Sequence, residues 1–170
     1  MSKYFFIGVI LGILLVGLFF WFPTHEPTPY IPQTYKVPSE VLPLTQKLGL
    51  PAELGVEVKL DAGACQGHNV AACYSENTIH IPRSTLTRPT AHISFAHEYL
   101  HYVWSQRMPQ QERDTLTQKL WEINNTNSSV SKRMEDYRNT NPQNMPTELY
   151  SIVCTEFNLL DCRKYLPNGV

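Results

Sequence analysis

The longest hydrophobic run of the sequence lies near the start of the chain. Residues 4–22 are 19 positions that contain only apolar residues and glycine. At about 1.5 Å per residue, a helix of this length nearly matches the ~30 Å hydrocarbon core of a bilayer. The run ends in Phe20-Trp21-Phe22-Pro23, without the small-residue cleavage site that follows a secretory signal. We therefore expect residues 1–23 to form an uncleaved transmembrane helix.

The charges beside this run predict its orientation in the membrane. Lys3 precedes the run, and the next Lys or Arg is Lys36. Because positive residues favour the cytoplasmic side, we expect a single-pass protein with a cytoplasmic N-terminus and an extracytoplasmic domain, periplasmic or extracellular. Six of the 13 prolines fall in residues 23–43, a composition typical of extended, semi-rigid backbone. We expect residues 24–45 to be a linker and residues 46–170 to be one folded domain.

Alternating hydrophobicity predicts a small antiparallel sheet at the start of this domain. Residues 56–60, 69–74 and 78–81 have the composition and period of strands, and residues 75–77 have the composition of a turn. Pro82 follows the last strand, and proline is confined to the edges of sheets. We therefore predict an edge strand formed by Thr78, Ile79, His80 and Ile81.

Helical periodicity dominates the remainder of the chain. Helices are predicted within residues 40–50, over 89–106, from 109 onward, over 131–138 and over 147–160. Pro89 and Pro109 suit first helical positions, and Thr147 suits an N-cap. Strands followed by helices predict an α+β fold in which helices pack on one side of the small sheet.

The most specific chemical pattern of the sequence is His97-Glu98-x-x-His101. On a helix, residues four apart share one face, so the two imidazoles can bind the same metal ion. Glu98 lies about 100° round the helix from His97, where it can reach a water on that metal without being a ligand. Zinc bound by neutral imidazoles lowers the pKa of its water towards ~7, and a neighbouring carboxylate can accept the proton. We predict one Zn²⁺ ion with Glu98 as the general base.

A catalytic zinc site needs a third protein ligand. A histidine six residues after His101 is excluded because Arg107 stands there, and Trp104 replaces the glycine of that longer motif. The predicted C-terminal helix offers Glu148 and Glu156, two turns apart on roughly the same face. One of these can be the ligand while the other supports a ligating histidine from behind.

At this point the chain resembles the gluzincin metallopeptidases, in particular the small single-domain members called minigluzincins. The resemblance is carried by His97-Glu98-x-x-His101 and by Glu148-x-x-Ser151, 47 residues further on. It implies a zincin-like fold, His97, His101 and Glu148 as zinc ligands, and a substrate peptide held against the edge strand 78–81. The chain departs from the pattern at Ile152, where an acidic residue is customary, and Glu156 is the alternative for that role or for the ligand. A transition-state stabiliser is not assigned; Tyr137, Tyr150 and Tyr165 are the candidates.

Composition narrows the partners and the compartment. The net charge is −1, and no cluster of Lys or Arg is present, which argues against nucleic acid as a partner. An even set of cysteines in an extracytoplasmic domain predicts two disulfides, with three pairings open: Cys65, Cys73, Cys154 and Cys162. A bond from Cys154 to Cys162 requires that the helix end between them, because eight helical residues span ~12 Å.

The sequence therefore predicts a membrane-anchored zinc metallopeptidase that acts on a peptide or protein substrate. The competing hypothesis is a non-catalytic zinc-containing ectodomain that serves as a binding or assembly module. Glu98 favours the enzyme, because a purely structural zinc site does not need that carboxylate. Hydrolysis of a non-peptide amide, such as one in a cell-wall polymer, is a second enzymatic alternative.

Overall fold

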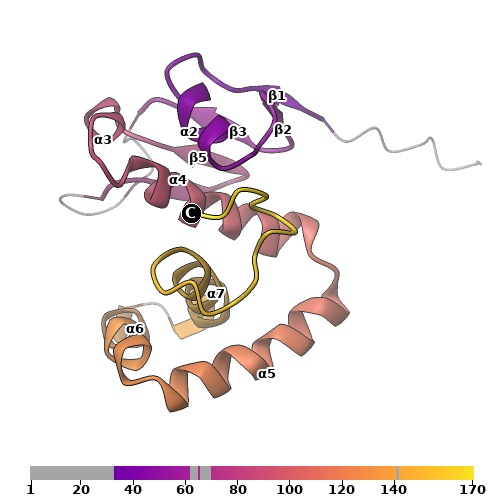
Figure 1. The fold of residues 1–170 in the computed structure, drawn as a ribbon, viewed down its shortest axis with the longest axis vertical. Helices are drawn as coiled ribbons and strands as arrows, with labels where there is room; N and C mark the ends of the chain where they lie inside the picture. The colour runs from indigo at the N-terminus through magenta and orange to yellow at the C-terminus, as the bar shows by residue number, and fades with distance from the viewer. Residues whose placement is uncertain (1–32, 62–64, 66–69, 141) are drawn as a thin grey trace, which may run out of the picture. The chain divides into compact units, whose positions relative to one another are not determined.

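The helix of the His-Glu-x-x-His motif lies at the centre of the computed structural model, between a small sheet and a group of C-terminal helices (Figure 1). The structure describes residues 33–61, 65, 70–140 and 142–170. Gln33–Val170 form one compact unit. The predicted transmembrane segment, residues 1–23, lies outside the described residues, as does the first part of the predicted linker. Among the described residues, no helix is both long and apolar enough to cross a membrane.

The folded unit begins earlier than the sequence predicts. Residues 33–45 belong to the predicted linker, yet they pack with the rest: Val37 is 3 % exposed and Val41 is fully buried. Strand β1 (Tyr35–Lys36) pairs antiparallel with β2 (Glu53–Leu54). Helix α2 (Leu42–Lys47) takes Pro43 into its first turn, where the missing N–H is not needed.

A three-stranded sheet comes next in the chain, and its order differs from the prediction. The strands are β3 (Glu57–Lys59), β4 (Cys73–Ser75) and β5 (Thr78–His80). The predicted turn between the last two is confirmed: Glu76 and Asn77 have φ values of 49° and 59°, as a two-residue type I′ hairpin requires. The sheet is mixed, because β3 runs parallel to β5 while β4 is antiparallel to it. The order is β3-β5-β4.

The prediction that Thr78–Ile81 form an edge strand is therefore wrong. Strand β5 is the central strand, paired on both sides, and the Ile81 N–H still bonds to the Lys59 carbonyl. Pro82 does not prevent this arrangement, because it stands after the last paired residue. The two edges of the sheet are β3 and β4.

Helices make up the second half of the unit. They are α3 (Arg83–Leu86), α4 (Ala91–Tyr102), the π-helical turn η1 (Val103–Arg107), α5 (Gln110–Thr126), α6 (Ser128–Thr140), the 3₁₀ turn η2 (Pro142–Asn144) and α7 (Met145–Thr155). Figure 1 shows α4 running below the sheet, with α7 on its other side and α5 and α6 further away. The predicted α+β class is thus confirmed.

The central position of α4 explains its burial pattern. Phe95, Ala96, Leu100 and Tyr102 are all buried, and together they cover more of the helix circumference than a single amphipathic stripe. One side of α4 contacts β4, β5 and α2, while another side contacts α7. The main core lies on both sides of this helix.

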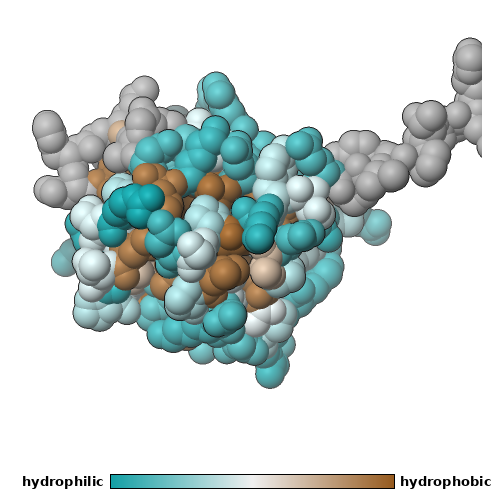
Figure 2. Space-filling model, turned by 90° about the horizontal axis from the view of Figure 1, so that it is seen from above, coloured by the Kyte–Doolittle hydropathy of each residue, from teal (hydrophilic) through white to brown (hydrophobic). Residues whose placement is uncertain are grey.

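The surface that covers the sheet is mixed in character. Figure 2 views the molecule from above the sheet and shows hydrophobic residues gathered near the middle of this face, surrounded by hydrophilic ones. Among the described residues, the large hydrophobic side chains classed as exposed are Leu159 and Val170. Exposed apolar atoms are an ordinary part of the surface of a folded domain.

Both disulfides of the structure join cysteines that are eight residues apart. The Cα atoms of Cys65 and Cys73 are 5.6 Å apart, and those of Cys154 and Cys162 are 5.9 Å apart. The second bond is possible because α7 ends at Thr155, five residues earlier than predicted. Asn158, with φ of 50°, helps the chain to turn back.

Candidate metal centre

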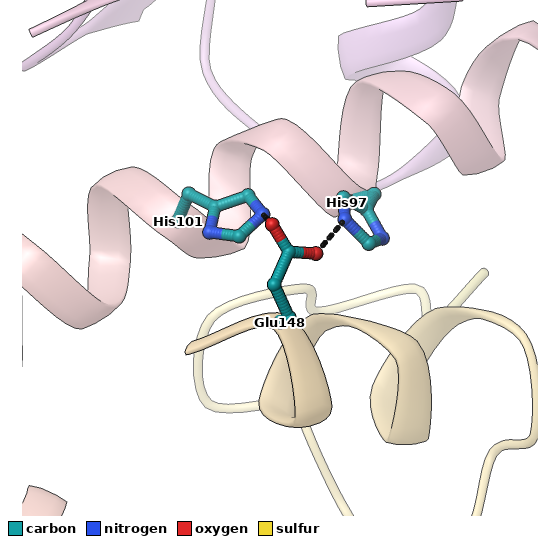
Figure 3. Close-up of side chains that lie close together, drawn as sticks. All are labelled: His97, His101 and Glu148. Atoms are coloured by element: carbon teal, nitrogen blue, oxygen red, sulfur yellow. Dashed lines mark hydrogen bonds and ion pairs between the residues drawn. The ribbon is translucent and has the colours of Figure 1, made fainter. Parts of the chain in front are cut away.

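Three side chains from two helices converge on one point (Figure 3). His97 and His101 lie one turn apart on α4, and Glu148 lies in the first turn of α7. The carboxylate of Glu148 points between the two imidazole rings. Potential ligand atoms of the three residues all lie within 4.8 Å of one another, and the group could hold a metal ion.

The spacing of these atoms fits a small metal ion. Nε2 of His97 is 3.3 Å from Oε2 of Glu148, and Nε2 of His101 is 3.5 Å from Oε1. Ligand atoms that a tetrahedral metal holds at ~2.0–2.2 Å lie roughly 3.3–3.6 Å apart. The carboxylate thus already lies at this spacing from each imidazole, and the ligand atoms, which all lie within 4.8 Å of one another, would draw closer to bind one ion together.

The cluster is largely shielded from water. The exposed fractions of the side chains are 13 % for His97, 12 % for His101 and 17 % for Glu148. Burial by itself raises the pKa of the Glu148 carboxyl, but hydrogen bonds to His101 and His97 outweigh it and lower that pKa from 4.5 to about 2. Burial likewise opposes the charged form of His97, yet the carboxylates of Glu148 and Glu98 raise its pKa overall. The carboxylate is thus ready to act as an anionic ligand.

Glu98 lies beside the cluster and contacts the sheet. Burial raises its pKa, while the charges of His97 and His101 and a hydrogen bond to the backbone of Tyr74 oppose that increase. The pairing of β4 explains this bond. Ser75 and Thr78 flank the hairpin loop, so the next pair, Tyr74 and Ile79, directs its backbone groups away from the partner strand. The Tyr74 N–H is therefore free of β5 and donates to the Glu98 carboxylate.

A cleft runs past these residues. A hollow of about 720 Å³ is lined by β4, by the C-terminal end of α4 and by the start of α7. A second hollow of about 350 Å³ lies beside it, next to Ile93, Ser94 and Arg133. Both are lined by His97, Glu98 and Tyr137. The His-His-Glu cluster therefore faces open space in two directions.

Glu156, the alternative third ligand, lines the second hollow with His97 and Glu98 but does not belong to the three-residue group. Its two carboxylate oxygens accept hydrogen bonds from Nε and Nη2 of Arg133 on α6, at 2.9 and 3.0 Å. The sequence does not reveal this partner, because Arg133 is 23 residues away in the chain and reaches Glu156 only through the packing of α6 on α7. The described structure thus brings Glu148, and not Glu156, to the two histidines.

The three tyrosines that are candidates for the transition-state stabiliser lie in different places. Tyr137 lines both hollows, and its hydroxyl oxygen accepts a hydrogen bond from Nη2 of Arg133 at 3.4 Å. Tyr150 is 1 % exposed and packs on Trp104, with ring centroids 5.3 Å apart. Tyr165 bonds to Glu112 on α5. Of these three, Tyr137 is the one that lines the cleft.

The predicted substrate strand is not where the sequence places it. Thr78, Ile79 and Ile81 are buried in the centre of the sheet, and the ring of His80 bonds to Asp61 at 2.6 Å. The edge strand that lines the cleft is β4, through Cys73, Tyr74 and Ser75. The sequence contains the hairpin signal for β4 and β5 but not the parallel pairing of β3, which places β5 in the middle.

Comparisons with protein-family models, with curated proteins and with solved structures find no significant match. The chain forms an α+β domain with two disulfides and a partly buried His-His-Glu group, on two packed helices, that could hold a metal ion.

Proposed function

We propose that the protein is a zinc-dependent peptidase, anchored to a membrane by residues 1–23 with its folded unit outside the cytoplasm. The observation that carries the proposal is the meeting of His97, His101 and Glu148 beside Glu98, in a cleft that extends to both sides of them. Two imidazoles and one carboxylate are a common ligand set of catalytic zinc. Both disulfides favour an oxidising compartment outside the cytoplasm.

His97, His101 and Glu148 would hold the zinc ion. When bound, zinc supplies a Lewis acid that polarises a carbonyl oxygen and makes a water molecule more acidic. Glu98 accepts a proton from the attacking water and later gives it to the leaving amine. The Tyr74 backbone stabilises the ionised form of Glu98, the form that accepts a proton, and both residues line the cleft.

The substrate peptide binds in extended form along β4. This strand is a free edge of the sheet, and free edges bind peptides by adding a strand. The Tyr74 carbonyl points away from β5 for the same reason as its N–H and can accept a hydrogen bond from the substrate. Because β4 also lines the cleft beside Glu98, a peptide bound there passes the catalytic carboxylate.

The test is the substitution Glu98→Gln in the zinc-loaded protein, assayed against a mixed peptide library. An amide can still accept the Tyr74 hydrogen bond but cannot take up a proton, so zinc content stays the same and hydrolysis falls by roughly 10²–10⁴-fold. The matched control is Glu122→Gln, an exposed glutamate of α5 that does not belong to the lining of either hollow, which leaves hydrolysis unchanged. Wild-type rates in Glu98→Gln would refute the mechanism. Zinc binding without any turnover in the wild-type protein would instead identify a non-catalytic zinc-containing module.

A further inference from the structure

The hydroxyl group of Thr147 contacts His101 on the side of the ring opposite Glu148. Oγ1 of Thr147 is 2.8 Å from Nδ1 of His101, while Nε2 of the same ring faces Glu148 at 3.5 Å. Thr147 and Glu148 are consecutive residues in the first turn of α7. Adjacent residues therefore contact the two nitrogens of one imidazole.

The position of Thr147 in its helix explains why its hydroxyl is available. Four threonines in α5 and α7 direct their hydroxyl to the carbonyl four residues before: Thr115, Thr117, Thr126 and Thr155. Four residues before Thr147 is Gln143, which lies in η2 and not in α7. Asn144 occupies the N-cap position of α7, so Thr147 is not the cap that the sequence predicts. Its hydroxyl is instead directed across the helix interface to His101.

The chemistry of imidazole gives this contact a role. A neutral histidine carries one N–H and one lone pair, and only the nitrogen with the lone pair can bind a metal. A hydroxyl oxygen can accept the hydrogen bond of Nδ1–H, which leaves the lone pair on Nε2, the nitrogen that faces Glu148. Groups that bond to the second nitrogen of a ligating histidine fix its tautomer and the orientation of its ring.

We propose that Thr147 is a positioning residue, whose hydroxyl holds His101 in the tautomer and ring orientation that bind the metal ion. The inference rests on the zinc site proposed above. It adds a group that the sequence pattern of the site does not contain. Because Thr147 and Glu148 are neighbours in the first turn of α7, the same helix turn supplies both the proposed ligand and the positioning hydroxyl.

The experiment compares Thr147→Val with Thr147→Ser in the full-length protein. Valine has the shape of threonine but no hydroxyl, whereas serine keeps the hydroxyl. The measurements are the Kd for Zn²⁺, from competition with a chromophoric chelator, and the visible spectrum of the Co²⁺-substituted protein. Thr126→Val is the matched control, because Thr126 is exposed on α5 and bonds only within its own helix.

We expect Thr147→Val to weaken Zn²⁺ binding by roughly 10–100-fold and to alter the Co²⁺ spectrum. The Kd of Thr147→Ser and that of Thr126→Val should stay within about threefold of the wild-type Kd, far less than the change expected for Thr147→Val. The inference is overturned if valine binds Zn²⁺ as tightly as threonine, or if serine is as weak as valine. In either of those results the zinc site itself stands, whereas a wild-type protein that binds no Zn²⁺ overturns the proposed function as well.

Discussion

Gly55 approaches the side chain of Tyr102, a residue of the helix α4 that carries His97 and His101. Gly55 and Val56 separate β2 from β3, and a Cβ added at Gly55 would overlap the hydroxyl of Tyr102 and lie 3.3 Å from its Cζ. Tyr102 directly follows His101 and is 3 % exposed. Its ring packs against Tyr99 and Tyr74, at centroid distances of 5.7 and 6.5 Å. The ring therefore has little room to move away.

We expect Gly55→Ala to destabilise the folded unit by about 1–3 kcal/mol, the usual cost of overpacking a filled core. For a unit of this size, such a loss lowers Tm by roughly 3–12 °C. Tyr102→Phe removes the overlapping oxygen together with its hydrogen bond to Arg107, at a cost of about 0.5–1.5 kcal/mol. Because Cζ remains close to the added methyl group, the rescue in the double variant is partial.

The assay is urea unfolding of the wild-type protein, the two single variants and the double variant, with disulfides intact. The double variant should be more stable than the sum of the single effects predicts, by about 0.5–2 kcal/mol. Strictly additive effects would show that the overlap is relieved by backbone movement and not by the ring. A Gly55→Ala protein as stable as the wild type would contradict the close approach itself.

Two further predictions concern the metal centre. Glu148→Gln should abolish stoichiometric zinc binding, because it removes the anionic ligand between His97 and His101. Glu156→Gln should keep one zinc per chain and lose only the ion pair with Arg133. Zinc analysis after gel filtration distinguishes the two variants, and the opposite result would make Glu156 the ligand. Removing the metal with a chelator should lower the Tm. An ion that binds only the folded state stabilises it by about 2.7 kcal/mol when the free ion concentration is 100 times the Kd. Equal Tm values in calorimetric scans with and without zinc would rule out a bound ion in the folded state.

The local features of the site follow directly from the sequence. The spacing of His97 and His101 places both rings on one face of a helix, because the helical repeat is fixed. The hairpin turn at Glu76 and Asn77 is also local, since both residues tolerate positive φ better than bulky or β-branched ones. In each case a few neighbouring residues determine the conformation by their own geometry.

The sequence is less informative where distant segments compete for one position. The position of β5 in the sheet depends on whether β3 pairs with it, and the pattern of Thr78–His80 is the same at an edge as in the centre. The short strands provide no long buried run that would distinguish the two. Pro82 favours an edge only if it lies within the paired region, and the pairing ends one residue before it.

The sequence alone therefore determined the two histidines of the site, the neighbouring carboxylate and the pair of alternative ligands on the last helix. Tertiary structure brought Glu148, and not Glu156, between the two imidazoles, because Arg133 of α6 bonds to Glu156 and the packing of α7 on α4 directs Glu148 to the histidines. It also placed the Thr147 hydroxyl on His101 and the Tyr74 N–H on Glu98. The physical reason is that helical periodicity fixes which residues share a face, whereas only the packing of helices and strands fixes what that face meets.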